Sequence, residues 1–505
     1  GHIIEMTKEH DLNRVVIASC TPRTHEPLFR DMMRQAALNP YLFEMTNIRD
    51  QCSWVHADVP EEATAKAKDL TRMAVARAAT LEPLQDMSFE VKASALVIGG
   101  GLAGMTTATS LADQGFRVHL IERGPDLGGR LRSLNYTLEG ADPQAHLADL
   151  LARIDGDALI DVYADAELMD FSGHVGNFRS VVRTPRGETE LEHGVVIVAT
   201  GGVEYVPDEY LHGEHPRVMT QGELERRLGA GDRAFEDGAD VAMIQCVGSR
   251  DEENPYCSRV CCGNAIKNAL KVKERNPDSN VYVFYRDIRT YGTREDSYRE
   301  AREAGVLFIR YEPDAKPRVS SEDGALVVRA YDPVLGAELE LRPDFLALSA
   351  GVRPHPDAFA LDKRLKIPRD IDGTFLEAHM KLRPVDFANE GMFLCGLAQA
   401  PKYAQESIAQ ATAVAARAAT ILSKRHLSVP GTVAQVDPEG CAACLTCIRT
   451  CPFDVPVIKD GAAYIEAAMC QGCGTCAAAC PAKVIDLGHY KDEQVAAGVA
   501  QAVGS

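Results

Sequence analysis

The stretch ALVIGGGLAGMTTATSLADQGFRVHLIER, residues 95–123, decides the fold of the central part of the chain. It predicts a buried strand, a glycine turn, a helix and a second strand that ends at Glu122. Gly99, Gly101 and Gly104 fit G-x-G-x-x-G in the strand-to-helix context that a dinucleotide-binding unit requires. The first glycine permits the turn, the second lets the backbone approach a pyrophosphate, and the third lets the helix pack closely on the strand. Glycines alone would also fit a tight structural turn, so the assignment needs further support.

Three later segments favour FAD as the bound dinucleotide. GPDLGGRL, residues 124–131, follows Glu122, which is placed to accept hydrogen bonds from a ribose, and resembles the FAD-binding members of the glutathione and thioredoxin reductase group. VVIVATGG, residues 195–202, is similar to the segment with which that group crosses back toward its flavin. GMFLCGLAQAPKYAQESIAQATAVAARAA, residues 391–419, resembles its last motif, where a helix start approaches the flavin ring. The predicted FAD-binding residues are Gly99, Gly101, Gly104, Glu122, Arg123, Gly129, Arg130, Leu131, Ala199, Thr200, Gly201, Gly396 and Ser407.

Two residues of the last motif bear on how a flavin would be held. The motif has aspartate after its glycine, but here Leu397 follows Gly396, which puts the usual contact to the ribityl–phosphate part of the flavin in doubt. Lys402 is a candidate catalytic residue that would offer a hydrogen bond or a charge at the flavin ring. The alternative for Lys402 is an ordinary solvent-facing charge.

The carboxy-terminal region carries two copies of C-x2-C-x2-C-x3-C-P, at residues 441–452 and 470–481. This run is typical of bacterial ferredoxins, in which three cysteines bind one [4Fe–4S] cluster and the fourth binds the other. One cluster would take Cys441, Cys444, Cys447 and Cys480, and the other Cys470, Cys473, Cys476 and Cys451. We expect each fourth cysteine to begin a helix. Two zinc sites are the alternative, but zinc ribbons have no use for a third and fourth cysteine at these spacings.

A second strand–loop–helix–strand unit has cysteines where a phosphate loop would have glycines. VAMI at 241–244 and NVYVFYR at 280–286 predict strands, and AIKNALKVKE at 265–274 predicts a helix. We predict that an unusual [4Fe–4S] cluster replaces nicotinamide binding at this loop; a redox disulfide and buried structural thiols are the alternatives. Its ligands would be Cys246, Cys257, Cys261 and Cys262, of which the adjacent pair begins the helix.

Composition places the chain among soluble, cytoplasmic redox proteins of three or four domains. It has 505 residues, 15 cysteines and a formal net charge of -19, which argues against nucleic-acid binding. No segment is long and apolar enough to span a membrane, and no secretory signal is present. Dense cysteine groups in a chain without export signals point to metal clusters in a reducing compartment.

Several segments together resemble the A-type subunits of heterodisulfide reductase over essentially the whole chain. These are VVIASCTPRTHEPLF at 15–29, YLFEMTNIRDQCSWVH at 41–56, the cysteine loop at 244–270 and YRDIRTYG at 285–292. The resemblance implies an α/β, thioredoxin-reductase-like flavoprotein with two dinucleotide-binding domains. The expected division is an incomplete amino-terminal α/β domain (1–90), an FAD domain (91–238 and 346–428), a second Rossmann-like domain (239–345) and a 2[4Fe–4S] ferredoxin domain (429–505).

The same resemblance implies a role in electron transfer. Such subunits pass electrons to B- and C-type subunits and to ferredoxin, receive them from hydrogenase- or formate-dehydrogenase-type modules, and in the best-known members perform flavin-based electron bifurcation. A dimer within a larger complex is expected. Other interpretations are an NAD(P)H- or disulfide-dependent flavoprotein reductase and a module in which the clusters serve redox sensing.

Two departures limit what the family implies here. Large members carry an inserted ferredoxin module after the segment at 124–131, but residues 131–198 contain no cysteine. Members also begin well before this chain does, with more cysteines upstream. Cys20 and Cys52 resemble positions of that amino-terminal domain, where they would be ligands of one more cluster or plain buried cysteines.

Overall fold

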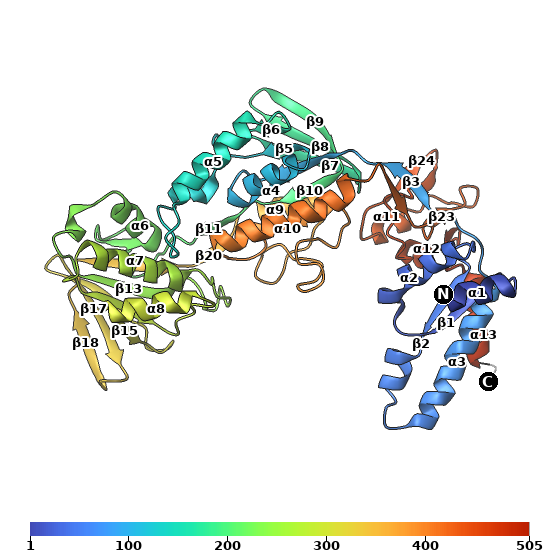
Figure 1. Ribbon diagram of the computed structural model, residues 1–505, viewed down its shortest axis with the longest axis horizontal. Helices are drawn as coiled ribbons and strands as arrows, with labels where there is room; N and C mark the ends of the chain where they lie inside the picture. Colours follow the sequence, from blue (N-terminus) through green and yellow to red (C-terminus); the bar gives the residue numbers. More distant parts are fainter. Residues whose placement is uncertain (504–505) are drawn as a thin grey trace. The chain divides into compact units, whose positions relative to one another are not determined.

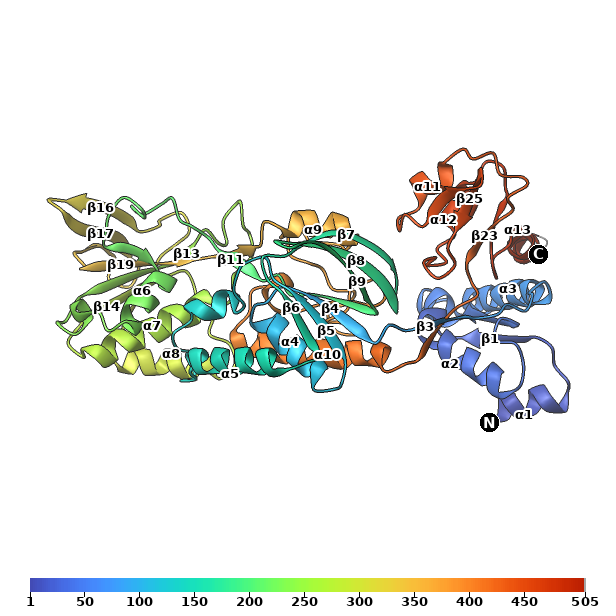
Figure 2. The same ribbon diagram turned by 90° about the horizontal axis from the view of Figure 1, so that it is seen from above.

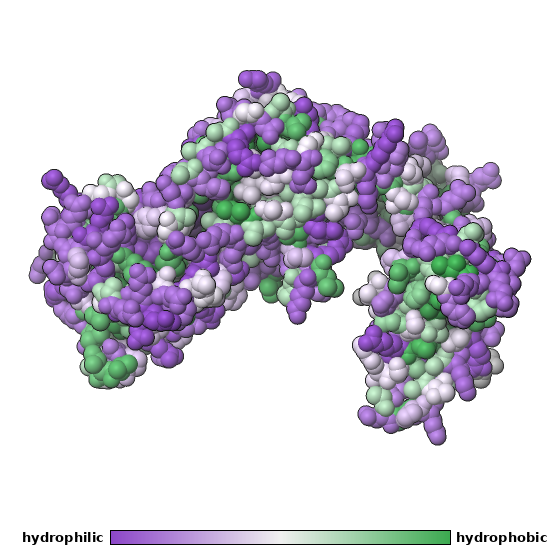
Figure 3. All heavy atoms as spheres, in the orientation of Figure 1, coloured by the Kyte–Doolittle hydropathy of each residue, from purple (hydrophilic) through white to green (hydrophobic). Residues whose placement is uncertain are grey.

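The structure is a computed structural model that describes residues 1–503. The chain forms two compact units: Gly1–Phe89 together with the chain from His426 onward, and Glu90–Arg425 (Figure 1). None of the helices within residues 1–503 combines the length and apolar content needed to cross a membrane. Hydrophilic side chains cover most of the face drawn in Figure 3, although exposed apolar side chains, Val334 and Leu335, lie at the tip of the hairpin formed by β17 (Ala325–Asp332) and β18 (Ala337–Leu341).

The predicted first dinucleotide-binding unit forms a five-stranded parallel sheet, in the order β21-β10-β4-β5-β6. Its strands are apolar on both faces because both faces are covered. On one face Ala95 and Val97 pack against helices, and on the other Leu96 and Ile98 pack toward a three-stranded antiparallel sheet (Figure 2). The elements are β4 (Ser94–Ile98), α4 (Leu102–Ala112), β5 (Arg117–Ile121), α5 (Pro143–Gly156), β6 (Ile160–Tyr163), β7 (Glu167–His174), β8 (Asn177–Thr184), β9 (Gly187–His193), β10 (Val195–Val198), β21 (Met392–Leu394) and α10 (Ala404–Leu422).

The second unit repeats this architecture, with parallel strands in the order β12-β19-β13-β14-β15. Helices cover one face, and a second antiparallel three-stranded sheet covers the other. The elements are β12 (Val218–Thr220), α6 (Gln221–Gly229), β13 (Val241–Val247), α7 (Cys261–Arg275), β14 (Val281–Tyr285), α8 (Arg294–Glu303), β15 (Leu307–Arg310), β16 (Arg318–Glu322), β17 (Ala325–Asp332), β18 (Ala337–Leu341) and β19 (Phe345–Ala350). An antiparallel pair, β11 (Gly202–Glu204) and β20 (Val352–Pro354), connects the two sheets. The predicted α/β class with two dinucleotide-type sheets is confirmed.

The other compact unit combines both ends of the chain. A parallel pair, β1 (Val15–Ser19) and β2 (Phe43–Asn47), packs with α2 (Pro22–Gln35) and α3 (Pro60–Ala79), and α13 (Asp492–Val503) lies along α3. Arg77 of α3 forms an ion pair with Glu44 and donates to the carbonyl of His489, and the Gly431 N–H donates to the Tyr41 hydroxyl at 2.6 Å. Residues of the predicted amino-terminal and ferredoxin domains therefore share one packed body.

The cysteine-rich carboxy-terminal part contains two antiparallel strand pairs and two short helices, α11 (Thr446–Thr450) and α12 (Thr475–Ala479). The expectation that each fourth cysteine begins a helix is wrong. Cys451 and Cys480 instead follow the ends of these helices with extended backbone, at φ -72° and -67°. Both precede a proline, and a residue before proline is pushed out of the helical region.

Candidate flavin and iron–sulfur sites

A cavity of about 550 Å³ lies in the unit Glu90–Arg425, and its lining is shared by residues of both sheets' helices and turns. It opens at the carboxyl ends of β4 and β10, where open α/β sheets bind their ligands. Among the predicted FAD-binding and catalytic residues, those that line it are Gly99, Gly101, Glu122, Gly129, Arg130, Leu131, Ala199, Thr200, Gly201, Gly396, Lys402 and Ser407. Gly104 supports the turn from behind. Arg123 is directed elsewhere, to an ion pair with Asp357.

The three glycines of the first turn are placed as their predicted roles require. Gly99 has φ +109°, and a Cβ there would lie 2.5 Å from the Ala199 carbonyl oxygen. A Cβ at Gly104 would lie 1.8 Å from the Gly99 oxygen, so only glycine lets α4 pack this closely. A Cβ at Gly101 would meet no atom within 4 Å, because Gly101 lines the cavity. The backbone at Gly101 is thus open to a phosphate at the amino end of α4.

The Glu122 carboxylate is held rigidly at the cavity edge. Its Oε2 accepts from the Gly100 N–H at 2.6 Å, and its Oε1 accepts from the Gly124 N–H at 2.8 Å. Each carboxylate oxygen has a further lone pair. The carboxylate therefore retains the capacity to accept hydrogen bonds from a ribose.

Two hydroxyl groups in the cavity wall have no protein partner. Thr200 Oγ1 and Ser407 Oγ are both buried and unpaired, and both residues line the cavity. A buried hydroxyl left unpaired costs about 1–3 kcal/mol. A polar ligand in the cavity would satisfy both groups, so the residues present fit FAD. Leu397, which replaces the expected aspartate, also lines the cavity and offers no polar group there.

Lys402 is buried, with only 8% of its surface exposed, so the solvent-facing alternative is wrong. Its Nζ donates to the Gly396 carbonyl at 2.7 Å and to Gln399 Oε1 at 2.8 Å. Burial lowers the pKa of Lys402 to about 8, because desolvation disfavours the charged form. The Lys402 ammonium is thus a hydrogen-bond donor at the cavity wall that can lose its proton near neutral pH.

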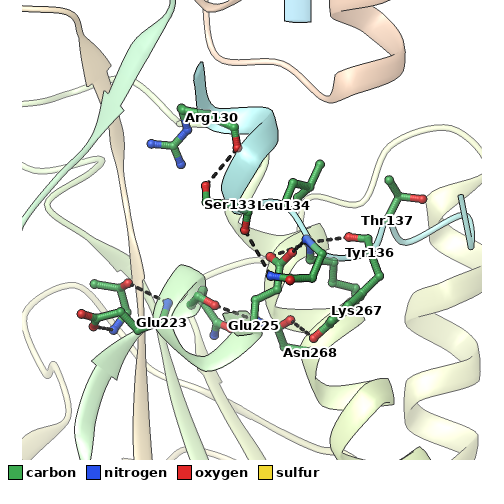
Figure 4. Close-up of polar contacts among 12 residues, drawn as sticks. Arg130, Ser133, Leu134, Tyr136, Thr137, Glu223, Glu225, Lys267 and Asn268 are labelled. Carbon is green, nitrogen blue, oxygen red and sulfur yellow. Dashed lines mark hydrogen bonds and ion pairs between the residues drawn. The ribbon is translucent and has the colours of Figure 1, made fainter. Parts of the chain in front are cut away.

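A buried polar network that includes Glu225 and Lys267 of the cavity wall is shown in Figure 4. Lys267 Nζ and Glu225 Oε2 form an ion pair at 2.7 Å, with side chains only 4% and 6% exposed. Glu225 accepts from the Asn135 N–H at 2.7 Å, Lys267 donates to the Tyr136 carbonyl at 2.9 Å, and the Tyr136 hydroxyl donates to Asn268 at 2.8 Å. The network ties the chain segment after Arg130 to α6 and α7. Sequence reasoning missed it, because the partners lie far apart in the chain and belong to no motif.

The four cysteines of the second loop come together at the start of α7. Cys246 ends the regular part of β13 with φ +64°, and Cys261 and Cys262 are the first two residues of α7. The four thiols are free and close enough to influence one another's charge: burial, together with its thiol neighbours, raises the pKa of Cys261, and burial raises that of Cys262 to about 12. Four cysteines are the ligand complement of a [4Fe–4S] cluster.

Cationic side chains surround this loop. Arg250 Nη1 lies 3.9 Å from Cys246 Sγ, and Arg250 and Arg286 pull the pKa of Cys246 down against the larger effect of burial. Arg289 is within electrostatic range of Cys257. A cluster held by four thiolates is anionic, so these arginines suit it. Val260, Gly263 and Asn264 of the same loop and helix line the flavin cavity.

The ferredoxin cysteines line two small cavities, one for each predicted set. Cys441, Cys444, Cys447 and Cys480 line one, and Cys451, Cys470, Cys473 and Cys476 line the other. The Ala463 N–H donates to Cys441 Sγ at 3.3 Å, and the Ala434 N–H donates to Cys470 Sγ at 3.5 Å. The exchange of the fourth cysteine between the two runs is therefore present in the fold, while cluster binding stays a prediction. Within residues 1–503 no group of three or more His, Cys, Asp or Glu is arranged to hold a single metal ion.

Cys20 and Cys52 lie near the carboxyl ends of β1 and β2. Cys20 Sγ accepts from Arg49 Nη1 at 3.2 Å, and the buried Cys52 thiol donates to the Ala63 carbonyl at 2.8 Å. Cys52 and Arg49 belong to the same π-helix, Arg49–Trp54, so the Arg49 side chain connects this helix to Cys20. A role for either cysteine in a cluster stays a prediction.

Comparisons with known proteins agree with this layout. Residues 97–163 match the family model of an NAD(P)-binding Rossmann-like domain, and residues 440–485 match that of a 4Fe-4S dicluster domain. The chain is 37% identical to the A-type subunit of the H(2):CoB-CoM heterodisulfide,ferredoxin reductase of Methanothermobacter thermautotrophicus, over 98% of this chain and 89% of that protein. It is 38% identical to the second of the A-type iron-sulfur subunits of the CoB--CoM heterodisulfide reductase of Methanopyrus kandleri, over 90% of this chain and 84% of that protein.

The first of these alignments runs over 589 residues, more than the 505 of this chain, so that relative carries residues that are missing here. Among solved structures, thioredoxin reductase of Lactococcus lactis is similar with a TM-score of 0.45 and 17% identity, over 65% of this chain and 99% of that one.

Proposed function

This chain belongs to the family of A-type heterodisulfide reductase subunits, an oxidoreductase family, and we propose that it transfers electrons between FAD and [4Fe–4S] clusters in a heterodisulfide-reductase-like complex. One observation carries the proposal: α7 begins with two of the four loop cysteines, and the next two residues, Gly263 and Asn264, line the flavin cavity. The cavity wall and two of the thiols thus adjoin in the first turn of α7. When bound, FAD exchanges electrons singly or in pairs, whereas each cluster exchanges one.

The chain's own residues bind and orient the flavin in this proposal. Gly101 and the amino end of α4 would receive the pyrophosphate, Glu122 the ribose, and the unpaired Thr200 and Ser407 hydroxyls further polar atoms. Lys402 would hold a donor at the ring. Glu225 and Lys267 would form part of the cavity wall beside the flavin.

A nicotinamide cofactor at the second loop is the competing interpretation, and the packing there disfavours it. Gly248, which follows the end of β13, has φ +61°, and a Cβ there would lie 2.1 Å from the Tyr205 ring. The Arg353 guanidinium covers that ring from 4.3 Å. The space that a phosphate would need next to a glycine backbone is therefore filled by an aromatic side chain. Bleaching of the flavin by NAD(P)H in the isolated chain would support the competing interpretation.

The finer proposal concerns partners and bifurcation. We infer that electrons from a hydrogenase- or formate-dehydrogenase-type module divide between ferredoxin and a disulfide held by B- and C-type subunits. Relatives' names include ferredoxin and the CoB-CoM heterodisulfide, which supports this division. Cys444 and Cys473 are exposed at the two ferredoxin cavities, where a one-electron partner would approach. A redox-sensing role is the alternative, and a flavin that never turns over with any reduced partner would favour it.

The decisive experiment counts iron and acid-labile sulfide per flavin in anaerobically purified protein. The ferredoxin part alone predicts about eight irons, and a cluster at the second loop raises this to about twelve. The variant Cys257→Ser/Cys261→Ser is expected to lose about four irons and to keep its flavin. Cys395→Ala is the matched control, because Cys395 is a fully buried thiol outside every predicted ligand set. Equal iron in wild type and in the double variant would return the loop to a structural or disulfide role.

A further inference from the structure

Arg259 occupies an unusual place in the cysteine loop, between Cys257 and Cys261. Its backbone adopts φ +59°, a left-handed conformation that long side chains rarely take. In that conformation its N–H donates to Cys257 Sγ at 3.3 Å. Backbone conformations of this kind persist where the surroundings fix them, and they gather at functional sites. The strained residue therefore contacts a predicted cluster ligand directly.

The side chain of Arg259 reaches the segment that begins α10. Its Nη2 donates to Glu406 Oε1 at 3.0 Å and to the Tyr291 hydroxyl at 3.1 Å, and its Nη1 donates to the Pro401 carbonyl at 3.3 Å. Glu406 lies in the first turn of α10, where its other oxygen accepts from the Tyr403 N–H at 2.9 Å and the Tyr291 hydroxyl at 2.7 Å. The fork of the guanidinium thus fixes the start of this helix.

That start of α10 is the wall of the flavin cavity. Lys402, Tyr403 and Ser407 all line the cavity. The packing between the two sides is close, because a Cβ at Gly263 of α7 would lie 2.3 Å from the Tyr403 hydroxyl. The Arg259 charge also reaches Lys402, whose pKa it lowers in addition to the larger effect of burial. Arg259 therefore contacts Cys257 of the loop and Glu406 of α10, and its charge also lowers the pKa of Lys402.

We propose that Arg259 is a positioning residue that fixes the loop cluster against the flavin and places a positive charge between the two redox centres. The inference rests on the proposed function, since it presumes a cluster at the loop. Arg259 itself takes up neither electrons nor protons. A cation near a redox centre stabilises its reduced, more negative form, so Arg259 raises the reduction potential of both centres. Its hydrogen bonds keep the separation between them constant.

The test compares Arg259→Gln with Arg259→Lys in the full chain loaded with FAD and iron. Arg259→Gln is expected to lower the midpoint potentials of the loop cluster and the flavin and to slow electron transfer between them by about tenfold. EPR measures the potential of the cluster, and visible absorption measures that of the flavin. Arg259→Lys retains the charge but has no fork to hold Glu406, Tyr291 and Pro401 together. It is expected to keep both potentials near those of the wild type and still to slow the transfer.

Arg294→Gln is the matched control. The Arg294 guanidinium also covers the Tyr403 ring, at 3.8 Å, forms an ion pair with Glu139 at 2.8 Å and lies 5.6 Å from the Tyr291 ring, but none of its described contacts is to a loop cysteine. It is expected to leave the loop cluster's potential unchanged. Equal potentials and rates in Arg259→Gln and Arg294→Gln would overturn the inference. If Arg259→Gln loses the loop iron, the transfer rate of Arg259→Lys tests the inference instead. A wild-type rate in Arg259→Lys would show that Arg259 does not position the cluster against the flavin. A wild-type chain with only about eight irons would instead refute the loop cluster itself, together with this inference.

Discussion

The two sheets of the Glu90–Arg425 unit have the same architecture and opposite loop chemistry. Each has five parallel strands with helices on one face and a three-stranded antiparallel sheet on the other. After β4 the chain turns through Gly99 and Gly101 and leaves the backbone open to a cavity. At the end of β13 it turns at Cys246, and Gly248, just beyond the strand, is covered by the Tyr205 ring. The same strand–loop–helix scaffold thus presents amides to a phosphate in one case and thiols to a metal cluster in the other.

The two helices that follow these loops show the difference position by position. The third residue is glycine in both, Gly104 in α4 and Gly263 in α7, but the first packs against its own strand turn and the second against Tyr403 from the flavin side. The seventh residue is the fully buried Ala108 in α4 and the buried Lys267 in α7. The first helix therefore serves its own sheet, whereas the second is built to contact its neighbour.

The largest effect is expected from Lys267→Met, which gives the seventh position of α7 the apolar character of α4. It leaves Glu225 buried without its partner, which costs about 3–5 kcal/mol of unfolding free energy. Urea unfolding measures the loss. The double variant Glu225→Gln/Lys267→Met should recover most of it, because no charge then remains buried. A loss below about 1 kcal/mol in the single variant would show that water reaches the pair.

Next in size is Gly104→Ala, which tests the third position of the first helix. The added Cβ would meet the Gly99 carbonyl oxygen at 1.8 Å, and two backbone segments cannot separate without opening the turn. We expect a loss of about 3 kcal/mol and a lower flavin content in the purified protein. The control is Gly156→Ala at the end of α5, where a Cβ meets nothing within 4 Å. Full flavin in Gly104→Ala would mean that the turn does not hold the pyrophosphate.

The equivalent change in the second helix, Gly263→Ala, should be milder. Its Cβ would meet the Tyr403 hydroxyl at 2.3 Å, and a side chain can move where a backbone cannot. We expect about 1–2 kcal/mol, measured by thermal unfolding, with partial rescue by Tyr403→Phe, which removes the clashing oxygen. If Gly263→Ala cost as much as Gly104→Ala, the distinction between the two helices would fail.

Much of this comparison is accessible from the sequence, because both loops are local patterns. Gly99, Gly101 and Gly104 predict the turn and its three roles, and the two cysteine runs predict which cysteines share a cavity. The same local reasoning predicts the helix that begins at Cys261. It fails for the backbone at Cys451 and Cys480, where the following proline overrides the helical tendency of the preceding residues.

Long-range pairings could not be predicted from the sequence. Glu225 and Lys267 are ordinary surface residue types, and nothing near them in the chain indicates that folding buries them together. Arg259 likewise gains its meaning only from Glu406, which follows it at a distance of 147 residues in the sequence. Nor does the sequence distinguish a buried lysine from an exposed one, so only the fold decides between the two alternatives for Lys402.

The smallest effect sharpens the comparison at the flavin itself. Ser407→Ala removes a buried hydroxyl that has no protein partner. In flavin-free protein the change should leave stability equal or slightly higher, because an unpaired buried hydroxyl costs free energy rather than contributing it. In the presence of FAD it should weaken binding by about 1 kcal/mol, roughly fivefold in Kd by fluorescence titration. These opposite signs separate a ligand-binding hydroxyl from a structural one.

Ser349→Ala offers the matched comparison in the second sheet, since Ser349 Oγ is also buried and unpaired but its residue does not line the cavity. It should share the effect on stability without any change in FAD affinity, and a loss of affinity equal to that of Ser407→Ala would show that the unpaired hydroxyls do not mark the flavin site.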